Sequence, residues 1–296
     1  MNLKITSHRL SRTDCLLKMV ATTSDGKIDL FGHEGQAKLY REFRPEYPEM
    51  LVSEILSLVD VSQRGMYVDV ACGSGQLTKL MSPSFVDSLG VDQSLEQLGQ
   101  ISEGDGRFRY VSGSAFDLPV NRDSVDLVTV AQALHWLLPY DKFFTEVLRV
   151  LKPGGVFVTV AYAFPKLKNA EAQMAVESFY FDLLGGAKSP GSTGCWWETN
   201  RPTIDGFYAD VPFPIDAKLR RLDQTVSISL EHYMNYLRTL SAYRTMLRSG
   251  ELDPLPELEL KIGTAFVSDD VGKVIPSELM IEVEIPFFIR WFRKVD

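Results

Sequence analysis

Short apolar runs alternate with amphipathic helical patterns between residues 66 and 161, and this alternation restricts the fold more than any other feature. Strands that alternate with helices form parallel sheets covered by helices on both faces. Right-handed crossovers bring the carboxyl ends of such strands to one edge, and ligands bind outside that edge where the strand order reverses. The sequence therefore predicts a doubly wound α/β fold. The runs expected to be strands are 66–71, 85–91, 108–111, 125–131 and 156–161.

The segments on either side of this alternation carry different signals. Residues 1–35 show no periodicity, so we expect a disordered or weakly ordered tail there, followed by one domain over 36–296. Residues 165–215 are rich in Gly, Pro and aromatic side chains, which predicts a cap inserted after the fifth strand. Further on, Ser229 is placed to cap a helix, and we expect 280–292 to form a pair of strands.

A glycine-containing loop follows the first predicted strand, in the sequence Val68-Asp69-Val70-Ala71-Cys72-Gly73-Ser74-Gly75. Gly73 and Gly75 allow the backbone to approach a ligand without steric hindrance from a Cβ atom. A helix is predicted over 76–81, and the amide groups at its start favour an anionic group. The pattern therefore predicts a binding loop at a strand–helix junction.

An acidic residue, Asp92, lies at the end of the second predicted strand. A carboxylate there can accept both hydrogen bonds from a ribose diol, so the loop and the acid together predict an adenosine-containing ligand. A dinucleotide fingerprint requires a third glycine, but Thr78 stands at that position. The loop therefore suits a small zwitterion, such as the methionyl part of S-adenosylmethionine, better than a pyrophosphate. A dinucleotide-dependent oxidoreductase is the alternative enzyme class.

These residues resemble the class I methyltransferases that use S-adenosylmethionine (EC 2.1.1.-), and in particular the type 11 group, whose first loop reads D-x-G-C-G-T-G. Within that group the chain is similar to the trans-aconitate methyltransferase branch. The resemblance extends from Tyr40 to the C-terminus. It implies a Rossmann-like, mostly parallel, seven-stranded sheet with an inserted cap. The segments that carry it are 40–48, 69–76, 90–92, 132–136, 149–155 and 237–243.

The resemblance also implies roles for residues at the strand ends. The loop would hold the methionyl portion of the donor, the second strand end the ribose, the third the adenine and the fourth the sulfur. Ala71 stands where Gly is commoner, and we expect it to adopt an ordinary φ. Ser114 stands where an acid is frequent, so stacking or backbone groups would contact the adenine instead. The residues assigned to the donor are Tyr40, Arg44, Asp69, Ala71, Gly73, Gly75, Asp92, Gln93, Ser114, Ala115 and Gln132.

Candidates for contact with the methyl acceptor each have two interpretations. His135, the only histidine near the expected donor site, is either a catalytic base or a residue that packs and hydrogen-bonds beside Trp136. Arg44 either pairs with a carboxylate or stacks on Tyr47. Side chains of the predicted insertion either line an acceptor pocket or form the core of the cap. They are Trp196, Trp197, Arg201 and Tyr208.

Composition narrows the class of acceptor and partner. The net charge of −8 repels phosphate backbones, so we do not expect a nucleic acid substrate. The longest apolar stretch, 156–164, is too short to span a membrane. Three separated cysteines without zinc-binding spacing suit a reducing compartment, so we expect a cytoplasmic protein without a metal site. We expect a small-molecule acceptor such as a carboxylic acid, and a protein or other acceptor is the alternative.

Overall fold

The computed structural model describes residues 42–101, 108–185, 204, 206–266 and 278–295. The chain forms two compact units. We call 45–165, 203–225 and 284–296 the sheet unit, and 1–44, 166–202 and 226–283 the helical unit. The predicted tail at 1–35 lies outside the described residues, as does Tyr40.

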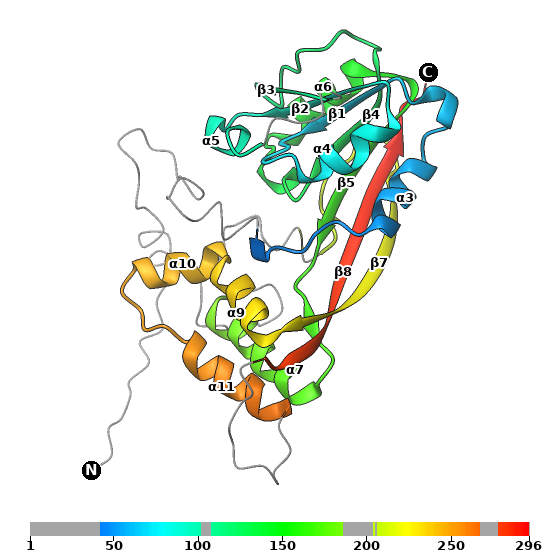
Figure 1. The fold of residues 1–296 in the computed structure, drawn as a ribbon. Helices are drawn as coiled ribbons and strands as arrows, with labels where there is room; N and C mark the ends of the chain where they lie inside the picture. Colours follow the sequence, from blue (N-terminus) through cyan, green and yellow to red (C-terminus); the bar gives the residue numbers. More distant parts are fainter. Residues whose placement is uncertain (1–41, 102–107, 186–203, 205, 267–277, 296) are drawn as a thin grey trace, which may run out of the picture. The chain divides into compact units, whose positions relative to one another are not determined.

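The sheet confirms the predicted doubly wound α/β fold. Its parallel strands lie in the order β3-β2-β1-β4-β5 (Figure 1), so the strand order reverses between β1 and β4. A crevice outside the carboxyl ends of the strands is expected at this reversal. The strands are β1 (Met66–Val70), β2 (Asp87–Asp92), β3 (Arg109–Ser112), β4 (Val125–Ala131) and β5 (Leu151–Tyr162).

The C-terminal segment differs from the expected pair of strands. It forms one long strand, β8 (Met280–Arg293), which runs antiparallel to β5. The partners that complete the sheet come from elsewhere: β7 (Lys218–Ser229) pairs with β8, and the two-residue strand β6 (Lys166–Leu167) follows β8 in the sheet order. The described part of the chain therefore contains a sheet of eight strands rather than the seven that were predicted.

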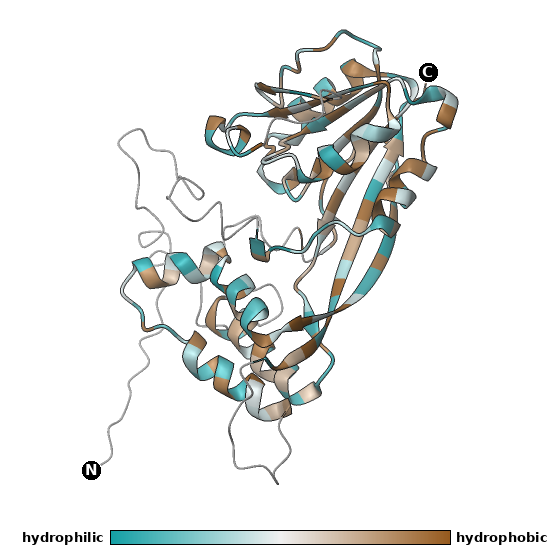
Figure 2. Ribbon diagram, in the orientation of Figure 1, coloured by the Kyte–Doolittle hydropathy of each residue, from teal (hydrophilic) through white to brown (hydrophobic). Residues whose placement is uncertain are grey.

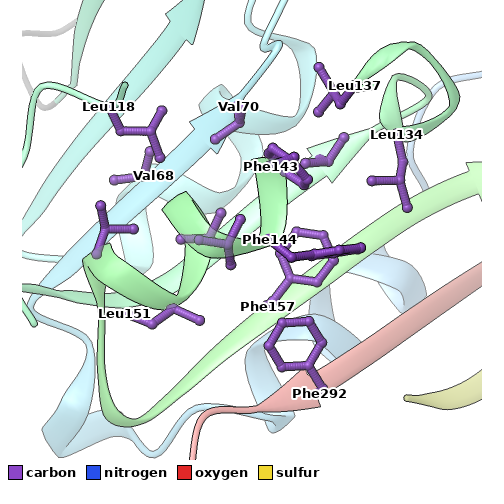
Figure 3. Close-up of a cluster of buried hydrophobic side chains, with 14 of the residues drawn as sticks. Val68, Val70, Leu118, Leu134, Leu137, Phe143, Phe144, Leu151, Phe157 and Phe292 are labelled. Atoms are coloured by element: carbon purple, nitrogen blue, oxygen red, sulfur yellow. The ribbon is translucent and has the colours of Figure 1, made fainter. Parts of the chain in front are cut away.

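The core of the sheet unit lies between the sheet and helix α6 (Tyr140–Val150). Phe143 and Phe144 point from α6 toward Phe157 of β5 and Phe292 of β8 (Figure 3). The ring centroids of Phe144 and Phe157 are 5.6 Å apart at 88°, an edge-to-face arrangement. Val68 and Val70 of β1 also belong to this core. Because side chains alternate along a strand, Asp69 between them faces the opposite side of the sheet.

Shorter helices connect the strands of the sheet unit. The predicted helix at 76–81 is confirmed as α4 (Gln76–Met81), which follows β1 directly. Other helices precede β1, lie between α4 and β2, follow β2 and follow β4. They are α3 (Glu49–Ser57), α5 (Leu95–Leu98) and the 3-10 turns η1 (Val61–Gln63), η2 (Ser82–Ser84) and η3 (Leu134–Trp136).

The helical unit is built from amphipathic helices, on which hydrophilic and hydrophobic residues both appear (Figure 2). Ser229 caps α9 as predicted, because its hydroxyl accepts a hydrogen bond from the backbone N–H of His232 at 3.0 Å. None of the helices in the described part of the chain is long and apolar enough to cross a membrane. The helices are α7 (Ala170–Glu177), the π-helical η4 (Ser178–Leu183), α9 (Leu230–Arg238), α10 (Ser241–Arg248) and α11 (Leu255–Phe266).

The predicted insertion at 165–215 is divided between the two units. Residues 166–202 group with 226–283, whereas 203–225 group with the sheet. The role of this region as a cap stays a prediction. Trp196, Trp197 and Arg201 lie outside the described residues.

Candidate functional site

The loop after β1 turns through several left-handed residues. Gly73 has a φ of 56° and Gly75 a φ of 75°, and α4 begins immediately after Gly75. Ala71 also has a positive φ, 54°, so the expectation of an ordinary φ at this residue is wrong. The left-handed conformation costs a residue with a Cβ atom roughly 1–2 kcal/mol. This strained residue lies immediately after β1, at the carboxyl edge of the sheet.

The two positions of the loop are occupied by glycine for different structural reasons. A Cβ atom on Gly75 would lie 2.9 Å from Cζ of Tyr110, so this glycine makes room for the tyrosine ring. A Cβ atom on Gly73 would approach only the Oε1 atom of Gln97, at 3.8 Å. Because neighbouring protein atoms do not require a glycine at position 73, its exposed backbone fits close approach by a ligand.

Asp92 fastens the loop to the end of β2. One carboxylate oxygen accepts a hydrogen bond from the backbone N–H of Gly73 at 2.8 Å. The other accepts one from the backbone N–H of Ser94, also at 2.8 Å. Each oxygen of a carboxylate can accept a second hydrogen bond, so Asp92 retains the capacity to bind a diol. Gln93, which the resemblance places beside the ribose, is exposed.

Asp69 is the buried centre of a hydroxyl network on the α4 side of the sheet. Its carboxylate accepts hydrogen bonds from the hydroxyls of Thr78 at 2.6 Å and Thr129 at 2.7 Å. Thr129 gives its only proton to Asp69, so the Tyr67 hydroxyl, 2.8 Å away, is the donor to Thr129. Burial raises the pKa of Asp69 to about 6, although the two threonine hydroxyls oppose this shift. Asp69 therefore joins α4 to β1 and β4 beneath the loop, and its contact with the donor stays a prediction.

Gln132 lies at the end of β4, the strand beside β1. Like Ala71 at the end of β1, it has a positive φ. Its φ is 56°, and its backbone N–H donates to the carbonyl of Val160 at 2.8 Å. The side-chain Nε2 is buried and has no hydrogen-bond partner among the described residues. A buried amide without a partner is costly, so this position is a candidate for contact with a ligand.

His135 lies in η3, just beyond Gln132, and is buried with 6% of its surface exposed. Its Nδ1 atom is 3.2 Å from the hydroxyl of Tyr208, and its ring centroid is 4.9 Å from that of Trp136. Tyr208 was expected in the cap, but it belongs to the sheet unit and is fully buried. The two interpretations of His135, as a catalytic base or as a packing residue, stay predictions.

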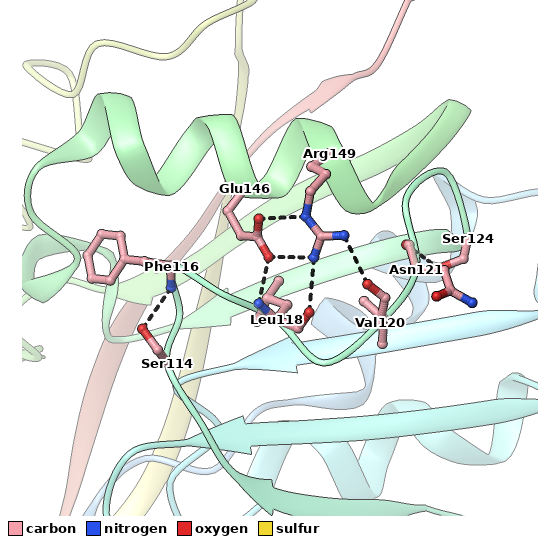
Figure 4. A network of polar contacts seen from close by, with 8 residues as sticks. All are labelled: Ser114, Phe116, Leu118, Val120, Asn121, Ser124, Glu146 and Arg149. Atoms are coloured by element: carbon pink, nitrogen blue, oxygen red, sulfur yellow. Dashed lines mark hydrogen bonds and ion pairs between the residues drawn. The ribbon is translucent and has the colours of Figure 1, made fainter.

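The segment after β3 is held by an ion pair on α6 (Figure 4). Arg149 donates to both carboxylate oxygens of Glu146, at 2.7 Å each. Glu146 also accepts the backbone N–H of Leu118 at 2.6 Å, and Arg149 donates to the carbonyls of Leu118 and Val120 at 3.0 Å. Burial raises the pKa of Glu146, but the hydrogen bonds from Arg149 and Leu118 outweigh it and leave the pKa lowered.

The residues predicted to contact the adenine lie just before the segment that this ion pair holds. Ser114 is exposed, and its hydroxyl accepts the backbone N–H of Phe116 at 3.1 Å. Ala115 is half-buried and packs at the border of the core. Glu146 and Arg149 therefore fix the chain at Leu118 and Val120, three and five residues beyond Ala115 (Figure 4).

Comparison with known proteins identifies the family. A family model described as a methyltransferase domain matches residues 68–159, the segment that contains the loop and the strand ends described above. The chain is 32% identical to an uncharacterised methyltransferase of Synechocystis sp. over 143 residues, which are 42% of this chain and 68% of the relative. The chain belongs to the methyltransferase family. A Dictyostelium discoideum protein provisionally named a methyltransferase is 29% identical over 87% of this chain and 93% of its own length.

A solved structure supports the same assignment. A protein from Anaeromyxobacter dehalogenans, provisionally described as a type II methyltransferase, is 29% identical, covers 86% of this chain and 99% of its own, and superposes with a TM-score of 0.72. S-adenosylmethionine is the methyl donor of this family, and the open backbone at Gly73 and the available lone pairs of Asp92 fit it. The assignment to the methyltransferases takes the place of the dinucleotide alternative.

Arg44, predicted for this methyltransferase site, groups with the helical unit, and its contact with the donor stays a prediction. Its guanidinium donates to the carbonyl of Thr239 at 3.2 Å and lies over the Tyr236 ring, 5.4 Å from its centroid. The suggested stacking of Arg44 on Tyr47 stays a prediction beside this contact with Tyr236. The Tyr47 ring packs near Phe287, with centroids 6.5 Å apart.

Several residues that organise the site were missed from the sequence. Thr78 was noted only because it is not a glycine, and Thr129, which also donates to Asp69, lies inside an apolar strand. The position of the Tyr110 ring beside Gly75 was missed because it depends on the pairing of β3 with β2. Glu146 and Arg149 look like an exposed helical pair, and the signal that could have found them is the spacing that puts Glu146 on the same face of α6 as Phe143 and Val150.

Proposed function

We propose that this methyltransferase transfers the methyl group of S-adenosylmethionine to a small molecule, and that the acceptor group is a carboxylate. The observation that carries the proposal is Gln132. Its buried Nε2 donor has no partner in the described part of the chain and stands at the end of β4, beside the loop after β1. An N–H donor in such a place stabilises an oxygen that carries negative charge.

The chemistry of the neighbouring residues agrees with an anionic acceptor. Methyl transfer from a sulfonium is an in-line displacement that depends on positioning and on exclusion of water. A carboxylate needs no base, whereas a hydroxyl or an amine must lose a proton. The carboxylates of Asp69 and Asp92 are each engaged in two hydrogen bonds, and the Nδ1 atom of His135 faces Tyr208. These groups suit binding and positioning better than removal of a proton.

The charge of the chain favours a small acceptor over a polyanion. The net charge of −8 works against binding to nucleic acids, whose phosphates would be repelled. A small carboxylate can instead be held by local donors such as Gln132. A protein acceptor stays as the alternative, and the trans-aconitate branch is one source of candidate acids to assay.

The test uses the purified full chain, S-adenosylmethionine with a radiolabelled methyl group, a panel of mono-, di- and tricarboxylic acids, and in parallel tRNA and cell-extract protein. The proposal expects label in a small, base-labile methyl ester. Label that appears only in macromolecules would contradict it.

A pair of substitutions connects the result to Gln132. Gln132→Glu keeps the size of the side chain but replaces the N–H donor by a carboxylate, so we expect ester formation to fall by at least about tenfold. Gln132→Asn keeps an amide and tolerates a positive φ, so it should retain more activity than the glutamate variant. Equal activity in the two variants would remove Gln132 from the acceptor site.

A further inference from the structure

The ring of Tyr110 crosses the sheet from strand β3 to the loop after β1. Tyr110 pairs with Gly90 of β2, and Gly90 pairs with Asp69 of β1, so the three residues lie side by side on one face of the sheet (Figure 1). Gly90 has no side chain, and the tyrosine ring occupies the space that one would fill. A Cβ atom on Gly90 would lie 2.5 Å from Cδ1 of Tyr110. The ring therefore extends across β2 toward β1.

The far end of the same ring reaches Gly75, the last residue of the loop. A Cβ atom on Gly75 would meet the hydroxyl oxygen of Tyr110 and would lie 2.9 Å from its Cζ atom. Gly75 has a φ of 75°, and its backbone N–H donates to the carbonyl of Cys72 at 2.9 Å, which closes the turn before α4. The ring of Phe108 packs edge-on to the Tyr110 ring, with centroids 5.2 Å apart. Contacts with Phe108 and with the two glycines therefore limit where the Tyr110 ring can lie.

At both glycines the ring contacts backbone, in two elements that are separate in the sequence. Gly90 lies inside β2, and Gly75 lies between β1 and α4. Because protein interiors are close-packed, a ring held between two backbone segments passes a displacement at one of them to the other. Gly75 is two residues from Gly73, whose open backbone fits close approach by a ligand. The position of the Tyr110 ring therefore determines the shape of the loop next to that open backbone.

We propose that Tyr110 is a positioning residue for S-adenosylmethionine: its ring rests on Gly90 and holds Gly75 in the left-handed turn that binds the donor. The inference rests on the loop after β1 as the donor site and is independent of the proposed acceptor. β3 also leads to Ser114 and Ala115, so the same ring links the segments predicted for the methionyl and adenine parts of the donor. Tyr110 acts before methyl transfer, because it prepares the loop for binding and does not touch the reacting atoms.

The first test displaces the ring without changing it. Gly90→Ala adds a methyl group 2.5 Å from Cδ1 of Tyr110, so the ring must move. We expect the affinity for S-adenosylhomocysteine, measured by calorimetry, to fall at least about tenfold. Gly65→Ala is the matched control, because a Cβ atom there would lie 3.0 Å from Oδ2 of Asp126, at the opposite edge of the sheet. It should lower the free energy of unfolding and leave the affinity unchanged. Native affinity in Gly90→Ala would overturn the inference.

The second test asks whether the ring transmits this effect. Tyr110→Phe keeps the ring and should bind within about threefold of the native chain, whereas Tyr110→Ala should bind at least about fivefold more weakly. Adding Gly90→Ala to Tyr110→Ala should change the affinity less than about twofold, because the ring is no longer there to be displaced. A Cβ atom on Gly90 would also lie 2.9 Å from Sγ of Cys72, and a loss caused by this sulfur would be the same in both backgrounds. Equal losses from Gly90→Ala in the two backgrounds would overturn the inference.

A third measurement reads the loop directly and needs neither acceptor nor donor. Hydrogen exchange of the unliganded full chain compares the native protein with Tyr110→Phe and Tyr110→Ala. We expect faster exchange over 72–77 in Tyr110→Ala, where the backbone N–H of Gly75 donates to Cys72, and native exchange there in Tyr110→Phe. Exchange over 121–126, at the opposite edge of the sheet, should stay native in both variants. Native exchange over 72–77 in Tyr110→Ala, or an equal increase at both edges, would contradict the role of the ring in the loop.

Discussion

At the amino-terminal edge of the parallel sheet, Lys152 donates to both carboxylate oxygens of Asp126 at 2.8 Å, and Asp126 also accepts the backbone N–H of Met66. At the carboxyl-terminal edge of the same strands, Ala71 and Gln132 are left-handed and the Gln132 amide is buried without a partner among the described residues. The Lys152–Asp126–Met66 contacts at the first edge pair their polar groups within the chain, whereas the Gln132 amide at the other edge keeps unused hydrogen-bonding capacity. The difference indicates that the first edge contributes stability and the second contributes binding.

The largest expected effect compares one glycine at each edge. Gly73 and Gly154 both have a positive φ, and a Cβ atom would meet little at either residue. Valine at either position should cost at least about 1–2 kcal/mol of stability through backbone strain. Gly73→Val should also abolish binding of S-adenosylhomocysteine, because its side chain would fill the open approach to the loop. Calorimetric titration and thermal unfolding measure both effects.

Comparison of the two valine variants tests whether the loop after β1 is the donor site. Gly154→Val should bind S-adenosylhomocysteine as the native chain does. Normal binding by Gly73→Val would show that the loop is not the donor site, and a loss of binding in both variants would show only that strain disturbs the whole sheet.

The second effect concerns Asp69 and the pH dependence of stability. Its pKa rises from 3.8 to about 6 on folding, so folding favours the protonated carboxyl. The resulting stabilisation is complete below pH 3.8 and is lost as the pH rises through 6, a loss of about 3 kcal/mol. Urea unfolding of the unliganded chain should therefore show a loss of stability between pH 4 and 7 that is absent in Asp69→Asn. Parallel pH curves for the two proteins would show that Asp69 ionises normally.

The third prediction compares Asp92, at the carboxyl-terminal edge of the sheet, with Asp126, at the amino-terminal edge. Asp92→Ala should weaken binding of S-adenosylhomocysteine by roughly 1.5–3 kcal/mol, the typical contribution of hydrogen bonds to a charged group. Asp126→Ala should instead lower the free energy of unfolding, since it leaves Lys152 and the N–H of Met66 without their partner. Calorimetry measures the affinity of both variants for S-adenosylhomocysteine, and denaturant unfolding measures their stability. An unchanged affinity in Asp92→Ala would remove it from the donor site.

The smallest effect is expected at Glu146, whose pKa shifts in the opposite direction to that of Asp69. Because the folded pKa of Glu146 is lowered, its stabilisation is present above the ordinary value of 4.5 and is lost as the pH falls through the folded pKa. Glu146→Gln should cost about 1 kcal/mol at neutral pH and weaken donor binding slightly, through the segment after β3. An increase in stability on this substitution would contradict the role of the ion pair.

The parts of the fold that depend on local pattern could be predicted from the sequence. Helix α4 and strand β4 begin and end where the apolar periodicity places them, and Ser229 caps its helix as expected. The pairing of β8 could not be read locally, because its partners β5 and β7 are distant in sequence.

The candidate site could likewise be predicted only in part from the sequence. Gly73 and Asp92 were found because residue type and strand position alone determine what they can do. The φ of Ala71 was missed because alanine normally avoids this conformation, so only the three-dimensional loop reveals it. The contact of Tyr208 with His135 was missed because nothing in a Gly- and aromatic-rich segment indicates which ring reaches the end of β4. Long-range contacts of this kind leave no periodic signal in the sequence.

Hydrogen exchange of the full chain with and without S-adenosylhomocysteine tests the central claim most directly, because it compares the two edges without any substitution. The account predicts that the ligand slows exchange in 69–76, 90–94 and 112–118, at the carboxyl ends of the strands. Exchange in 62–66 and 121–126, at the opposite edge, should not change. Protection confined to the amino-terminal edge, or no protection at saturating ligand, would contradict the account.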